Sequence, residues 1–175
     1  MKKAVILDRD GTIIENLDYV HRLEDYKLIP NAIKGLNILK DYELLIVTNQ
    51  SGIGRGIYSV EDMHKFNKFL VKDLKKHNVN IKKIYYCPHN PEDNCDCRKP
   101  KTKLLKDAQA ELEIDLKKSF LIGDTKTDIE LGKNIGCKTI LVLIGHGSKI
   151  KNEIKPDYIA KDLLDAAQWI LKNDK

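Results

Sequence analysis

The sequence has no long hydrophobic run and few aromatic residues, and each shortage excludes a class of protein. No stretch approaches the roughly 20 apolar residues that a membrane-spanning helix requires, so we expect no membrane contact. After Met1-Lys2-Lys3, only four apolar residues precede Asp8, too few for the core of an export signal, which predicts a cytoplasmic protein. Aromatic residues make up 6% of the chain, which argues against a basic, aromatic surface for nucleic acid.

The chain also lacks internal repeats, low-complexity tracts and any linker long enough to separate two units. Its 175 residues therefore predict one domain, 1–175, with a full core. Hydrophobic residues make up 42% and charged residues 33%, as in an ordinary globular protein. The net charge of +5 suits a small anionic ligand, although a solvated lysine-rich surface explains it equally well.

Cysteine is scarce, yet three of the four cysteines crowd one loop. Cys87-Pro88-His89 and Cys95-Asp96-Cys97 supply three thiols and an imidazole, which is a complete ligand set for tetrahedral zinc. The spacing differs from that of common zinc fingers, and unconnected free thiols are the alternative. Because Cys87, His89, Cys95 and Cys97 would fill all four positions, we expect a structural Zn²⁺ in the loop 87–97. Cys137 is interpreted as a small core residue.

Short strand-like runs alternate with amphipathic stretches along the whole chain. The runs are 4–7, 44–48, 83–87, 120–122 and 139–142, and the helical stretches are 32–40, 60–77, 103–112, 128–135 and 163–171. This alternation predicts an α/β fold, a three-layer Rossmann-like parallel sheet with helices on both faces. Ser59 with Asp62 three residues later indicates a capping box at the start of the second helix.

Two carboxylates follow the first apolar run, in Asp8-Arg9-Asp10-Gly11-Thr12. Side chains alternate along a strand, so Asp8 and Asp10 start on the same side. Two like charges this close are costly unless a cation lies between them or they share a proton. Metal-assisted chemistry needs such a pair, one carboxylate as nucleophile or ligand and the other as proton carrier. Taken alone, the motif also fits a plain strand followed by an Asp-Gly turn.

Polar residues also follow three further strands, and ligands of parallel sheets bind beyond the carboxyl ends of the strands. Thr48-Asn49-Gln50-Ser51 could hold a phosphate through its hydroxyl and loop N–H groups, although such a stretch alone is more often a polar turn. Lys99, between Arg98 and Pro100, is a point charge suited to a phosphoryl group. We favour Asp124 as a metal ligand and Asp128 as a helix cap or a support behind that ligand.

These motifs, in this order and over nearly the whole chain, resemble those of the haloacid dehalogenase superfamily of phosphohydrolases. The D-R-D-G-T motif, T-N-Q-S-G-I at 48–53 and the cysteine loop with R-K-P at 98–100 look like the heptose 1,7-bisphosphate phosphatases. Those enzymes share the zinc loop with bacterial histidinol-phosphatases. Tyr19-Val20-His21 and Gly54-Arg55-Gly56 look more like the heptose enzymes. Thr125 stands where these often carry a substrate-contacting lysine, which keeps histidinol-phosphate open as the alternative substrate.

The resemblance implies a phosphatase that removes the 7-phosphate of D-glycero-D-manno-heptose 1,7-bisphosphate, for ADP- or GDP-heptose synthesis. Asp8 would form an aspartyl-phosphate, and Asp10 would protonate the leaving sugar oxygen and then activate water. Mg²⁺ would be held by Asp8, the Asp10 backbone carbonyl and Asp124. The resemblance further assigns the phosphoryl oxygens to Thr48, Asn49 and Lys99, and the rest of the substrate to Arg98, Asn16, Asp18, Tyr19, Gln50 and Ser51.

No insertion is long enough for a separate cap domain, so residues 15–27 and the zinc loop must supply the pocket walls. We expect a monomer acting on a small sugar bisphosphate. A basic zinc module that binds nucleic acid is the alternative from another class of protein. The acidic stretch 90–94 within the zinc loop argues against it, as does the low aromatic content.

Overall fold

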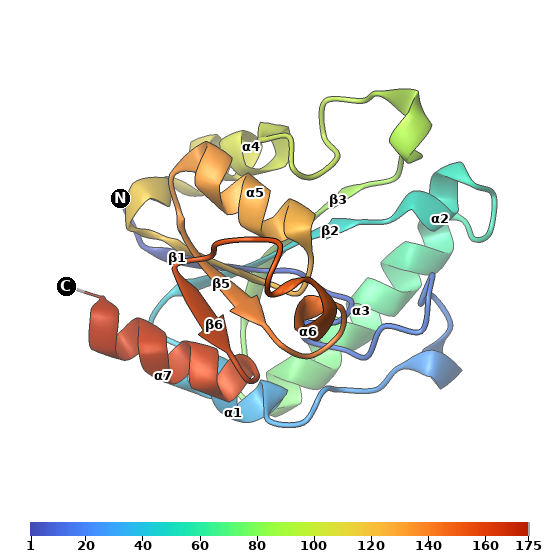
Figure 1. Ribbon diagram of the computed structural model, residues 1–175. Coiled ribbons are helices and arrows are strands. Elements are labelled where there is room, and N and C mark those ends of the chain that lie inside the picture. The colour runs from blue at the N-terminus through green and yellow to red at the C-terminus, as the bar shows by residue number, and fades with distance from the viewer. Residues whose placement is uncertain (175) are drawn as a thin grey trace.

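The computed structural model describes residues 1–174, so Lys175, the last residue of the predicted domain, lies outside the described residues. One parallel sheet of six strands runs through the molecule in the order β3-β2-β1-β4-β5-β6 (Figure 1). The strands are β1 (Ala4–Leu7), β2 (Glu43–Asn49), β3 (Ile81–Cys87), β4 (Phe120–Gly123), β5 (Lys138–Val142) and β6 (Tyr158–Ala160). This confirms the predicted α/β fold, and it adds β6, which the sequence did not indicate.

Helices cover both faces of the sheet. They are α1 (Ala32–Ile38), α2 (Ser51–Gly54), α3 (Val60–Lys76), α4 (Lys103–Leu112), α5 (Lys126–Ile135), α6 (Gly147–Ile150) and α7 (Leu163–Asn173). Short 3-10 turns lie at Leu23–Asp25, Pro91–Asp93 and Leu116–Lys118. α1, α3 and α7 pack on one face, and α4 and α5 pack on the other. The five predicted helices are all present, whereas the four-residue helices α2 and α6 are additions.

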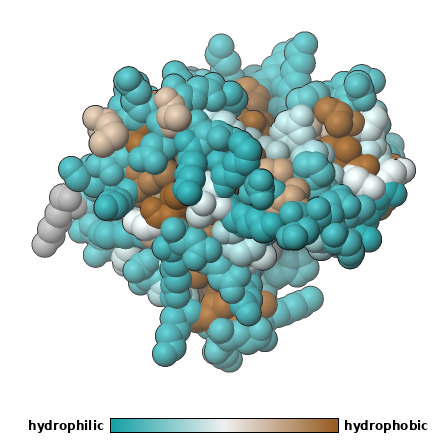
Figure 2. All heavy atoms as spheres, turned by 90° about the horizontal axis from the view of Figure 1, so that it is seen from above, coloured by the Kyte–Doolittle hydropathy of each residue, from teal (hydrophilic) through white to brown (hydrophobic). Residues whose placement is uncertain are grey.

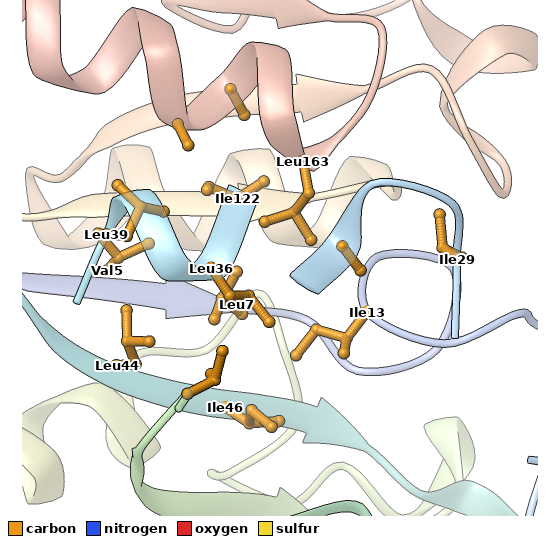
Figure 3. Packing of buried hydrophobic residues seen from close by; sticks show 14 of the residues in the cluster. Val5, Leu7, Ile13, Ile29, Leu36, Leu39, Leu44, Ile46, Ile122 and Leu163 are labelled. Atoms are coloured by element: carbon orange, nitrogen blue, oxygen red, sulfur yellow. The ribbon is translucent and has the colours of Figure 1, made fainter. Parts of the chain in front are cut away.

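The alternation of side chains along β1 explains why its four residues are all apolar. Val5 and Leu7 join the core on the side of α1, α3 and α7, and Figure 3 shows Leu7 beside Leu36 of α1 and Val5 beside Leu39. Ala4 and Ile6 join the second core, under α4 and α5. A strand buried on both faces has no solvent side, so it reads as a continuous apolar run.

Capping boxes begin two of the helices. Ser59 is the N-cap of α3, and its side chain and that of Asp62 exchange bonds with each other's backbone N–H, as predicted. In α5, however, the N-cap is Thr125, and Asp128 is the third residue of the helix and completes the box. The interpretation of Asp128 as a cap is therefore right in kind, but the helix begins two residues earlier than predicted.

Hydrophilic residues predominate on one face of the molecule. On the face that Figure 2 shows, hydrophobic residues lie in separate small areas within a hydrophilic surround. Within residues 1–174, no helix combines the length and the hydrophobicity needed to cross a membrane.

The chain order of the strands reverses beside β1. From β1 the chain builds outward through β2 and β3, then returns to add β4, β5 and β6 on the other side. The crossovers on the two sides run in opposite directions, which opens a crevice at the carboxyl ends of β1 and β4. Asp8 follows β1 directly at this point.

Candidate active site

A cavity of about 360 Å³ lies at the carboxyl ends of the central strands. Leu7 is level with Ile46 in β2 and with Ile122 in β4, so the residues that follow project beyond the same edge. The cavity brings together every residue predicted to act in catalysis or substrate binding, namely Asp8, Asp10, Asn16, Asp18, Tyr19, Thr48, Asn49, Gln50, Ser51, Arg98 and Lys99. Their individual roles stay predictions.

Lys99 is buried at the floor of this cavity. Its ammonium group lies 3.0 Å from Asp8 Oδ1 and 2.7 Å from Asp128 Oδ1, and it donates to the Val47 carbonyl at 2.9 Å. Burial lowers the pKa of Lys99, but the charges of Asp128 and Asp8 outweigh burial, so the net direction is upward and the side chain stays protonated.

Two residues at the end of β2 shape the same floor. The Asn49 side chain accepts a bond from the Lys99 backbone N–H at 3.0 Å, so it anchors the segment that carries the lysine. Thr48 Oγ1 accepts from Gln50 Nε2 at 2.8 Å, which leaves its own O–H free to donate to a ligand.

The buried charges do not balance. Asp8, Asp124 and Asp128 each place a carboxylate oxygen within 4.8 Å of the others, against the one ammonium of Lys99. Burial raises the pKa of Asp8 well above its usual value, and the Asp128 charge adds to that rise. Burial and the same charge raise the pKa of Asp124 to about 6. The site therefore favours binding of a cation.

The donor set fits a hard divalent ion. Asp124 Oδ2 accepts from the His146 backbone N–H at 2.8 Å, but its buried Oδ1 has no hydrogen-bond partner among the described residues. Both Asp128 oxygens are occupied, one by Lys99 and the other by Thr125. Asp8 and Asp124 are thus the carboxylates available to Mg²⁺, which prefers such oxygens. Gly11 leaves space for the Asp124 carboxylate, because a Cβ at position 11 would overlap that carboxylate.

The four zinc-type side chains meet in the loop after β3. Cys87 Sγ lies 3.5 Å from Cys95 Sγ, and Cys97 Sγ lies 3.7 Å from Cys95 Sγ and 3.3 Å from His89 Nδ1. Zn–S bonds of about 2.3 Å in a tetrahedron imply S···S edges of about 3.8 Å. Burial raises the pKa of Cys95, but bonds from Cys87 and backbone N–H groups prevail and lower it to about 7. The cluster therefore fits the predicted Zn²⁺.

Comparisons with known proteins agree with this geometry. A family model described as HAD hydrolase-like matches residues 96–166. The D-glycero-beta-D-manno-heptose-1,7-bisphosphate 7-phosphatase of Haemophilus ducreyi is 37% identical over 97% of this chain and 98% of its own length. The protein of that name from Helicobacter pylori 26695 is 42% identical over 81% of this chain and 84% of its own length.

A solved structure resembles the whole fold. The D,D-heptose 1,7-bisphosphate phosphatase from B. bronchiseptica, complexed with magnesium and phosphate, aligns with a TM-score of 0.91 and 27% identity, over 97% of this chain and 98% of that one. The chain belongs to the heptose bisphosphate phosphatase family of the haloacid dehalogenase superfamily. It is a phosphoric monoester hydrolase with the α/β fold of that superfamily.

The pocket walls of this heptose bisphosphate phosphatase family member come from more segments than the sequence indicated. Segment 15–27 contributes, as expected, but no residue of the zinc loop 87–97 lines the cavity, and only Arg98 and Lys99 directly after that loop reach it. Tyr58, Thr125, Thr127 and His146 also line the cavity. His146 Nε2 lies 3.2 Å from Asn16 Nδ2, and this contact closes the wall between two distant loops. Thr125 directly follows Asp124 and stands at the position where the resemblance implies a substrate contact, whereas no motif marks Tyr58 or His146.

Proposed function

We propose that this chain removes the 7-phosphate of D-glycero-D-manno-heptose 1,7-bisphosphate. The observation that carries the proposal is the full-length similarity to a phosphatase named for that reaction. The polar cavity around Asp8 supports it, because its floor combines carboxylates, a hydroxyl and an ammonium group. Phosphoryl transfer needs such positioning and charge neutralisation more than it needs covalent chemistry from the protein.

In this proposal Asp8 is the nucleophile. A carboxylate oxygen of Asp8 attacks phosphorus and forms an aspartyl-phosphate while the P–O bond to the sugar breaks. Asp10 gives its proton to the departing sugar oxygen and later takes one from the water that hydrolyses the aspartyl-phosphate. Lys99, which lies 3.0 Å from Asp8, orients the carboxylate and offsets charge on the phosphoryl oxygens, together with the Thr48 hydroxyl.

Asp8, the Asp10 backbone carbonyl and Asp124 would hold a catalytic Mg²⁺. A bound Mg²⁺ neutralises charge on the phosphoryl oxygens and on the carboxylates. The unpartnered, buried Asp124 Oδ1 supports this assignment. Cys87, His89, Cys95 and Cys97 would hold a structural Zn²⁺ and fix the loop that leads to Arg98.

The sugar end of the substrate would meet the walls of the cavity. Arg98 lines it next to Lys99 in sequence, and we assign it to the second phosphate of the substrate. The remaining contacts would come from Asn16, Asp18, Tyr19, Asn49, Gln50 and Ser51. We further propose a monomer that acts in the cytoplasm, because a thiol-rich zinc loop suits that reducing compartment.

Substrate choice provides the test of this function. We expect kcat/KM for heptose 1,7-bisphosphate to exceed that for histidinol-phosphate at least about tenfold, the equivalent of one modest contact of ~1.4 kcal/mol. The reason is that a guanidinium binds a phosphate through two parallel hydrogen bonds but repels the cationic amine of histidinol-phosphate. Phosphate release over both substrates, with each anomer of the heptose, measures this ratio. A preference for histidinol-phosphate would overturn the assignment.

Arg98→Ala tests recognition separately from chemistry. We expect it to reduce the preference for the bisphosphate while slowing the hydrolysis of p-nitrophenyl phosphate by less than about threefold, because the small ester lacks a second phosphate. The matched control is Arg55→Ala, an exposed arginine outside the cavity lining. Equal losses on the two substrates would assign Arg98 to the reaction centre or to the fold of the loop.

Magnesium removal should stop turnover without unfolding the protein. Dialysis into Mg²⁺-free buffer is expected to abolish phosphate release while the far-UV circular dichroism stays unchanged, because the two cores do not involve the site. Added Mg²⁺ should restore the activity of the wild type but not of Asp124→Asn, which loses a charged ligand. Full activity in the dialysed, metal-analysed protein would contradict the magnesium assignment.

A further inference from the structure

Arg9, between the two aspartates of the D-x-D motif, has a completely buried side chain. Arginine is almost never fully buried unless it is paired, because desolvating the charge is costly. Its Nη1 donates to Asn67 Oδ1 at 2.9 Å, and its Nη2 donates to the Val20 carbonyl at 2.8 Å. The guanidinium carbon lies 4.8 Å from the centre of the Phe66 ring. The plane of the guanidinium is therefore fixed by α3 and by segment 15–27.

The remaining edge of this guanidinium faces Asp10. Arg9 Nε lies 3.1 Å from Asp10 Oδ1 and 3.2 Å from Oδ2, and Nη2 lies 3.0 Å from each of these oxygens. Gln50 Nε2 donates to the same Oδ2 at 3.0 Å, and Gln50 Oε1 accepts from Arg9 Nη2 at 3.2 Å and from the Tyr58 hydroxyl at 2.6 Å. Arg9 thus holds both oxygens of Asp10, and Oδ2 alone also accepts from the Gln50 amide, so Oδ1 has one donor fewer.

We propose that Arg9 is a positioning residue for proton transfer. Its guanidinium fixes the orientation of the Asp10 carboxyl, so that Oδ1 can give its proton to the leaving sugar oxygen. The inference rests on the proposed role of Asp10. As the bond from Asp8 to phosphorus forms and the P–O bond to the sugar breaks, the Asp10 proton passes to the sugar oxygen. Arg9 itself, being fully buried, contacts neither the substrate nor phosphorus.

The competing explanation is that Arg9 only ties its neighbours together. A purely structural residue would affect all substrates alike, whereas a residue that orients a proton donor matters most when the leaving group needs the proton. Phenyl phosphate and p-nitrophenyl phosphate form a matched pair for this purpose. They have nearly the same shape, but phenolate is a poor leaving group and p-nitrophenolate is a good one.

The experiment measures the release of each phenol in a single turnover, so that only the step forming the aspartyl-phosphate is observed. Arg9→Lys keeps the charge but cannot make the two-point contact. We expect it to slow the reaction of phenyl phosphate at least about 30-fold, and that of p-nitrophenyl phosphate less than about threefold, since general acid catalysis contributes about 10²–10⁴-fold. Arg55→Lys, the same change at an exposed arginine outside the cavity lining, is the control and should change neither rate.

The Asp10→Asn variant distinguishes a failure of the proposed role of Asp10 from a failure of the inference on Arg9 alone. If it shows no difference between the esters, the proposed role of Asp10 fails, and the role of Arg9 fails with it. If Asp10→Asn shows the difference and Arg9→Lys slows both esters equally, only the inference on Arg9 is overturned.

Asn67→Ala is a second variant, for use if Arg9→Lys does not fold. It removes an anchor of the guanidinium without touching Asp10. We expect it also to slow phenyl phosphate more than p-nitrophenyl phosphate, but by a smaller factor of about threefold. A folded Asn67→Ala protein that slows both esters equally, or slows neither, would also overturn the inference.

Discussion

Replacing Asp8 with asparagine is expected to abolish phosphate release and to leave the fold intact. A carboxamide cannot form the aspartyl-phosphate, and the loss of covalent catalysis on so slow a reaction should cost many powers of ten. Stability should be kept, because Asp8 adds a third carboxylate to a cluster that holds one ammonium, and Lys99 retains Asp128. Phosphate release and a thermal melt measure the two effects.

The control for this substitution is Asp107→Asn, which neutralises an exposed carboxylate on α4 that pairs with Lys103. It should turn over at the wild-type rate, since an exposed ion pair contributes little. Mass spectrometry of acid-quenched wild type should show one phosphoryl group on the peptide that contains Asp8. Turnover of a sequence-verified Asp8→Asn protein within tenfold of the wild type would remove Asp8 from the role of nucleophile.

Cys95→Ala is expected to remove the zinc and most of the activity. Structural zinc sites contribute on the order of 10 kcal/mol to their loops. The core under α4 and α5 includes Cys87, with Cys95 and Cys97 packed against it, whereas the core under α1, α3 and α7 contains no residue of the zinc loop, so we expect local loosening rather than global unfolding. Lys99 lies two residues beyond Cys97, and misplacing a catalytic group by about 1 Å can cost 10²-fold. We therefore expect kcat/KM to fall about 100-fold or more.

Metal analysis and circular dichroism test this prediction, with about one zinc per chain expected in the wild type. The matched control is Cys137→Ala, because Cys137 is a buried free thiol outside the cluster. It should keep its zinc and lose about 1 kcal/mol of stability, as small core changes do. Freshly prepared, reduced wild type without zinc would contradict the structural-zinc assignment.

The floor of the site was predictable because short-range rules determine it. Asp8 follows β1 directly and Asp10 comes two residues later, and parallel pairing brings the ends of β1, β2 and β4 to one edge. Each polar group directly after a buried strand therefore belongs to the same crevice. The cysteine loop is similar, since ligands so close in sequence need only a tight turn to meet.

The rest depends on contacts that the sequence does not mark. An arginine usually lies on the surface, so nothing in the motif distinguishes Arg9 as buried until α3 places Phe66 and Asn67 against it. His146 joins the site through a loop that returns from β5. β6 has only three residues and forms through pairing with β5, which local pattern cannot anticipate.

The two edge strands of the sheet, β3 and β6, are poor templates for pairing with another molecule. β6 is too short to offer a long template for a strand of another molecule. β3 is longer, but Lys82 and Lys83 are exposed on it, and Lys83 is also bound to Glu111 of α4. A strand added from a second chain would have to desolvate these lysines and displace that pair. Both edges of the six-stranded sheet therefore disfavour the addition of a strand from another molecule.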